Sequence, residues 1–151
     1  MKFTFASYAK LIALLQQNNY FIANYDNWQQ KEHCVILRHD IDSSIQKALM
    51  FAKLEQRLNA TSTYFVLVTS DFYNALSAQS IAMLREIQAC GHDIGLHFDE
   101  LSYPEIAEDR NLITAKILQE KEILEKAMDY PITKVSMHRP SKETLAEDIQ
   151  I

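Results

Sequence analysis

Three clusters of polar side chains carry the residue types that metal-dependent chemistry needs. They are Arg38-His39-Asp40-Ile41-Asp42, His97-Phe98-Asp99-Glu100 and His138-Arg139-Pro140-Ser141. Each cluster comes directly after, or at the end of, a short run of apolar, β-favouring residues. Carboxylates and imidazoles from separate strands form a mixed oxygen and nitrogen site that suits a divalent metal such as zinc. The clusters therefore predict a metal centre, provided that the fold brings them together.

The residues within these clusters suggest separate chemical roles. Asp42, His97 and one further group could hold the metal, and Asp40 lies close enough to accept a proton from a water molecule there. Each residue also has a simpler structural interpretation. A single histidine near a strand end is usually a hydrogen-bonded structural group, Asp42 could cap a helix, and Asp40 could form an ion pair with Arg38. One shared site explains all three clusters together, so the pattern favours the functional interpretation.

Strands that alternate with helices must position the clusters. Apolar runs predict strands at 34–37, 61–68, 93–98 and 134–137, and helical spacing predicts helices at 45–58, 77–89 and 104–128. An earlier helix is expected to begin at Ser7 and end near Asn18. Asp42 or Ser43 is expected to cap the second helix, and Pro104 to lie in the first turn of the last. The right-handed crossover rule then predicts an α/β fold, a parallel (β/α) repeat whose strand ends share one rim.

Composition limits the classes of function. A chain of 151 residues with 48% hydrophobic and 23% charged residues predicts one globular domain over 1–151. The net charge of -5, without a cluster of Lys and Arg, argues against a nucleic-acid partner. The sequence has no signal-peptide pattern and no run of about 20 apolar residues, so we expect no membrane span and a cytoplasmic location.

From Val35 to Ser141 the sequence resembles the NodB-type polysaccharide deacetylases, which are metal-dependent carbohydrate esterases with an irregular (β/α) barrel. The likeness rests on four segments: Asp40-Ile41-Asp42, Ser62-Thr63-Tyr64-Phe65-Val66, Gly91-His92-Asp93-Ile94-Gly95-Leu96-His97 and Arg139-Pro140. The resemblance implies that Asp40 is the general base and that Asp42 and His97 bind the metal. It also implies that Arg139 orients Asp40 through a charge-assisted hydrogen bond.

The sequence is most similar to a branch of the family that has an Arg-His-Asp-x-Asp start, several members of which are associated with surface-polysaccharide gene clusters. Segment 70–74 (Ser-Asp-Phe-Tyr-Asn) also resembles this branch. We assign this segment no chemistry and expect a loop or helix-capping role. The expected partner of the domain is an N-acetylated sugar.

The sequence departs from the family pattern at the second metal histidine. The position where that histidine normally stands is occupied by Leu101. His138 is the preferred replacement, which completes an expected metal set of Asp42, His97 and His138. Asp99 and His92 are weaker candidates, and His92 is expected to be structural because it lies at the start of a strand.

The later family motifs, including the histidine that acts as general acid, would fall beyond residue 151. We therefore expect the N-terminal part of a barrel, truncated at its C-terminus, whose open sheet edges could favour a homo-oligomer. The expected function is removal of an N-acetyl group from a sugar by a metal-activated water. The alternative is a non-catalytic or degenerate module that binds metal or glycan. A phosphohydrolase of the His-Asp class is disfavoured, because its motif normally lies on a helix.

Overall fold

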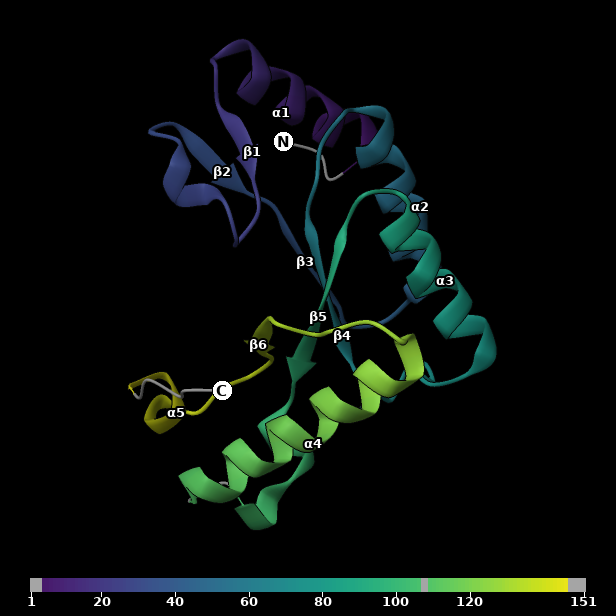
Figure 1. Cartoon of the computed structure of the whole chain (residues 1–151), viewed down its shortest axis with the longest axis vertical. Coiled ribbons are helices and arrows are strands. Elements are labelled where there is room, and N and C mark those ends of the chain that lie inside the picture. The colour runs from purple at the N-terminus through teal and green to yellow at the C-terminus, as the bar shows by residue number, and fades with distance from the viewer. Residues whose placement is uncertain (1–3, 107–108, 147–151) are drawn as a thin grey trace.

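The core of the protein is a curled sheet of four parallel strands with helices between them. The computed structural model describes residues 4–106 and 109–146. The strands are β3 (Arg38–Ile41), β4 (Thr63–Leu67), β5 (Asp93–Phe98) and β6 (Val135–Met137), and they pair in the order β3-β4-β5-β6. The connecting helices are α2 (Ile45–Arg57), α3 (Ala78–Ala89) and α4 (Arg110–Met128), which follow one another along one side of the sheet (Figure 1). The predicted α/β class and the parallel (β/α) repeat are confirmed.

A smaller N-terminal layer precedes this sheet. It consists of α1 (Phe5–Gln17), β1 (Phe21–Ala23), the 3-10 turn η1 (Trp28–Gln30) and β2 (Cys34–Ile36). The predicted strand at 34–37 is β2, but β2 pairs with β1 in a separate two-stranded sheet. After Leu37 the chain continues into β3, which contains most of the Arg38 to Asp42 segment. A strand does precede this segment, as predicted, but the segment also forms a strand of its own, because pairing with β4 draws polar residues into the sheet.

Three predicted helix starts were wrong. Thr4, not Ser7, accepts a backbone hydrogen bond at the start of α1, and Ser44 accepts the one from Lys47 at the start of α2. Because Ser44 caps α2, the carboxylate of Asp42 is free for another role. The last long helix begins only at Arg110, after the cap residue Asp109. Before it lie two 3-10 turns, η2 (Glu100–Ser102) and η3 (Pro104–Ile106), and a short helix α5 (Lys142–Ala146) follows β6.

Apolar side chains from the strands and from α2, α3 and α4 form one core. The largest fully buried members include Tyr64, Phe98, Leu84, Ile117 and Leu124. All five residues of β4 are buried, as expected for a strand covered on both faces. No helix in the described ranges is both long and apolar enough to cross a membrane.

A buried polar cluster joins α1 and α2 to the sheet. Glu55 of α2 is 0% exposed. Its carboxylate accepts hydrogen bonds from Ser62 Oγ at 2.6 Å, from Tyr64 Oη at 2.8 Å and from the Tyr8 hydroxyl. It also lies 2.8 Å from His39 Nε2 on β3, which must donate because an ionised carboxylate only accepts. We call these five residues the Glu55 cluster.

Candidate metal centre

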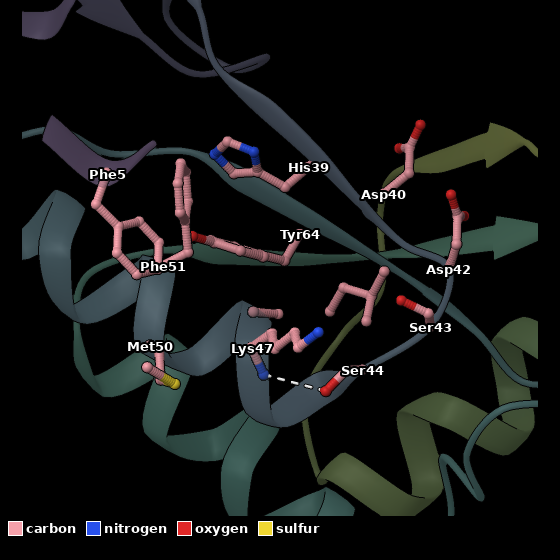
Figure 2. A pocket seen from close by; sticks show the side chains of 12 residues that line it. Phe5, His39, Asp40, Asp42, Ser43, Ser44, Lys47, Met50, Phe51 and Tyr64 are labelled. Carbon is pink, nitrogen blue, oxygen red and sulfur yellow. Dashed lines mark hydrogen bonds between the residues drawn. The ribbon is translucent and has the colours of Figure 1, made fainter. Parts of the chain in front are cut away.

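The alternation of side chains along β3 separates its residues onto two sides. In Figure 2, His39 and Tyr64 lie beside Phe51 in a pocket of about 530 Å³ between β3 and α2, whereas Asp40 and Asp42 lie at its other end. The His39 ring is 4.8 Å from the Tyr64 ring and 4.9 Å from the Phe51 ring, centroid to centroid. His39 therefore lies on the other side of β3 from Asp40 and Asp42 (Figure 2). Successive side chains of a strand point to opposite faces, so His39 faces the core while its neighbour Asp40 faces the rim.

The three predicted metal ligands meet at the carboxyl ends of β3, β5 and β6. Asp42 Oδ1 lies 3.6 Å from His97 Nε2 and 3.5 Å from His138 Nδ1, and the two imidazole nitrogens are 3.1 Å apart. A tetrahedral metal with bonds of about 2.0–2.1 Å separates its ligand atoms by about 3.3 Å. The three atoms thus have nearly the spacing of one face of a tetrahedral zinc site. We call these residues the metal triad.

His97 is held in the tautomer that a metal ligand needs. Its side chain is 2% exposed, and its Nδ1 lies 3.0 Å from the carbonyl oxygen of Ser136 on β6. A carbonyl oxygen only accepts, so Nδ1 carries the proton and the lone pair of Nε2 faces the triad. Burial lowers the pKa of His97, and this effect outweighs the opposing hydrogen bond to Ser136 and the negative charge of Asp40. The neutral imidazole, which is the form that binds metals, is favoured.

The predicted base, Asp40, lies at the edge of the triad. Its Oδ2 is 3.9 Å from His97 Nε2. Arg38 Nη2 donates to both oxygens of Asp40, at 2.6 and 2.8 Å, and to Ser136 Oγ at 2.6 Å. The ion pair between Arg38 and Asp40, left open by the sequence, is therefore present. Ser136 contacts both His97 and the Arg38–Asp40 pair, because its carbonyl oxygen accepts from His97 and its hydroxyl accepts from Arg38.

Arg139 lies at the same rim but has a different partner from the one expected. Its Nη2 donates to Asp99, so the hydrogen bond that the resemblance assigns to Arg139 and Asp40 is made by Arg38 instead. Asp99 is a buried carboxylate whose burial raises its pKa, but the hydrogen bond and charge of Arg139 outweigh burial and lower it. Asp99 also caps η2 by accepting from Leu101 N. These contacts engage Asp99 outside the triad and leave His138 as the third member.

His92 has the structural role that the sequence predicted. It is 5% exposed, at the opposite end of β5 from the triad. Its Nδ1 lies 3.2 Å from Ser62 N, and its Nε2 lies 2.9 Å from the carbonyl oxygen of Ala52. Both ring nitrogens are thus used in joining α2 to the sheet.

Comparison with known proteins adds information about the fold. No family model and no curated protein matches the sequence. The structure is similar to that of a deacetylase from Streptococcus pyogenes, PplD, solved in complex with acetate, with a TM-score of 0.65 and 14% sequence identity. The match covers 91% of this chain and 65% of that one, so the chain spans about two thirds of the length of the deacetylase. At this identity the likeness shows the fold, and it confirms the expected partial (β/α) barrel of the deacetylase type.

Proposed function

We propose that the chain is a metal-dependent deacetylase domain that hydrolyses the N-acetyl group of a sugar. The observation that carries this proposal is the metal triad, with ligand atoms 3.1–3.6 Å apart, beside the carboxylate of Asp40. A deacetylase-type fold that places these groups at the carboxyl ends of its strands supports the same conclusion. The substrate class rests on the sequence resemblance and on the activity named for the similar structure.

Asp42, His97 and His138 would hold the metal, and one carboxylate with two imidazoles is a donor set typical of zinc. When bound, zinc would supply a Lewis acid that polarises the acetyl carbonyl and lowers the pKa of water. The residues of the chain would supply orientation and proton transfer. Asp40, whose side chain is 34% exposed, can be reached by water and would accept its proton.

Arg38 would keep the Asp40 carboxylate in place, since it donates to both of its oxygens. In the overall reaction, water adds to the carbonyl carbon of the acetyl group and the C–N bond breaks. Acetate then leaves, and the amine of the sugar takes up a proton. Arg139 lies at the rim with an exposed guanidinium and would contact the substrate or hold Asp99 in place.

Zinc affinity and acetate release test the proposal separately. We expect Asp42→Ala and His97→Ala each to weaken zinc binding, measured by isothermal titration calorimetry, by more than about 100-fold, the upper range for residues that merely orient ligands. His33→Ala is the matched control, because His33 is an exposed histidine outside the triad. Asp40→Asn should keep the zinc affinity and abolish release of acetate from N-acetylglucosamine oligomers.

Unchanged zinc affinity in both triad variants would overturn the metal assignment. A chain that binds zinc and sugar but releases no acetate would instead support the non-catalytic binding module.

A further inference from the structure

The loop after β4 holds an exposed aromatic side chain in a fixed position. Phe72 is 74% exposed, the highest value among the large hydrophobic side chains of the described residues. Hydrogen bonds join the loop around Phe72 to the last residue of β3 and to the residue that follows it. Ser70 Oγ accepts from Phe72 N at 3.1 Å and donates to the carbonyl oxygen of Asp42 at 3.4 Å. The Tyr73 hydroxyl donates to the carbonyl oxygen of Ile41 at 2.6 Å. The exposure of Phe72 therefore does not follow from a loose loop.

Phe72 borders the same cavity as the metal triad. This cavity has a volume of about 510 Å³, and its lining includes Asp42 and His138 of the triad. Leu67, Phe72 and Leu101, of which Leu101 is 57% exposed, supply its apolar parts. Its remaining lining consists of polar and charged side chains. A cavity with an apolar surface, several hydrogen-bonding groups and a reactive centre is a typical small-molecule site.

We propose that Phe72 is the platform on which the sugar ring of the substrate stacks, so that the N-acetyl group is directed to the metal triad. The inference rests on the proposed function and names the part of the substrate that the chain recognises. A pyranose ring has two apolar faces of C–H groups and a rim of hydroxyl groups. An aromatic ring can cover such a face, and polar side chains around it can bind the rim.

The charges of the cavity indicate a neutral sugar. Three carboxylates line it, those of Asp42, Asp71 and Asp99, together with the guanidinium of Arg139. Arg139 is paired with Asp99, so two negative charges remain. A bound divalent cation balances these two charges. An N-acetylated hexosamine without a carboxylate therefore fits the site better than an acidic sugar, whose negative charge would have no unpaired cationic side chain among the described lining residues.

Sugar binding by the zinc-loaded chain tests the inference. The probe is the N-acetylglucosamine trisaccharide, titrated by calorimetry. We expect Phe72→Ala to weaken its binding at least about 5-fold, in line with the loss seen when aromatic residues that stack on nucleobases are replaced by alanine. Phe72→Trp should stay within about threefold of the wild type. Leu14→Ala is the matched control, because Leu14 is 55% exposed but lies on α1. Zinc affinity and thermal midpoint should be unchanged in all three variants.

The outcomes distinguish this inference from the proposed function. If the wild type binds zinc and the trisaccharide, and Phe72→Ala binds the sugar equally well, the platform is overturned while the proposed function stands. An equal loss of sugar binding in Phe72→Ala and Phe72→Trp also overturns the platform, because Phe72→Trp keeps an aromatic ring at this position and Phe72→Ala does not. If the wild type binds no zinc, the proposed function fails and the inference fails with it. Tighter binding of N-acetylneuraminic acid than of the trisaccharide would overturn the neutral-sugar assignment.

Discussion

Replacing Glu55 with alanine should cost a large part of the stability of the domain. The Tyr64 hydroxyl is buried and would lose its acceptor, which costs about 1–3 kcal/mol. The substitution also removes the carboxylate that accepts a hydrogen bond from His39 Nε2, and losing a hydrogen bond to a charged group costs about 1.5–3 kcal/mol. Tyr8 and His39 are only partly buried, so water can replace part of the hydrogen bonding that they lose. We therefore expect a decrease of about 3–5 kcal/mol in the free energy of unfolding.

Urea denaturation followed by circular dichroism measures this change, with Glu55→Gln as the matched variant. Glutamine keeps the shape and one acceptor oxygen, so it should cost less than alanine. The thermal midpoint of Glu55→Ala should fall by roughly 6–20 °C, at about 2–4 °C per kcal/mol for a domain of this size. A Glu55→Ala variant within about 1 kcal/mol of the wild type, with an unchanged denaturant slope, would refute the assignment of Glu55 as the centre of the cluster.

The pH dependence supplies an independent check. Burial raises the pKa of Glu55, but hydrogen bonds from His39, Ser62 and Tyr8 and the electrostatic interaction with His39 outweigh burial, and the net pKa is lowered. A lowered pKa in the folded state means that the unfolded chain binds more protons as the pH approaches the ordinary glutamate value of about 4.3. The stabilisation is therefore fully present at neutral pH and is lost as the pH falls further, through the folded-state pKa. The difference in free energy of unfolding between the wild type and Glu55→Gln should shrink at acidic pH.

Three further substitutions test the site and the sheet. Arg38→Gln should lower the rate of acetate release about 10- to 100-fold without changing zinc affinity, because the proposed base Asp40 loses the group that fixes its position. Arg139→Gln should affect the Michaelis constant more than the rate. The reverse pattern would restore the role that the resemblance implies for Arg139. Gly95→Ala should lower the free energy of unfolding by about 1–3 kcal/mol in urea denaturation, because its methyl carbon would lie 2.6 Å from ring carbons of Phe65; an unchanged denaturation midpoint would show that the ring moves freely.

Topology explains why the metal triad could be predicted from the sequence. Alternating strands and helices predict a parallel sheet, and in a parallel sheet all carboxyl ends lie at one rim. His97 lies near the end of one buried strand and His138 follows the next, so their convergence requires only the order of the strands. His138 was expected because the usual second histidine is absent, and the structure places it 3.1 Å from His97.

The hydrogen-bond partners of the site could not be predicted in the same way. Arg38 and Arg139 both lie near the rim. Which of them donates to Asp40 depends on how the strands pair residue by residue. Ser136 gave no signal, because a serine within an ordinary apolar strand has no distinctive pattern. Its importance arises only from pairing beside His97 in the sheet. Glu55 left a weak signal, since it continues the apolar stripe of Ile45, Leu49 and Ala52 on α2, but its partners come from distant segments.

The division of β3 into two sides links the stability of the domain to its chemistry. His39 joins the strand to the Glu55 cluster, and the next residue, Asp40, faces the metal triad. A shift of this strand by one residue would exchange the two sides and place the carboxylate in the core. The Glu55 cluster opposes such a shift. The buried carboxylate of Glu55 needs a hydrogen-bond donor, which the imidazole of His39 supplies and the carboxylate of Asp40 cannot supply. The buried cluster on one side of β3 therefore determines which residue of the segment faces the metal triad on the other side.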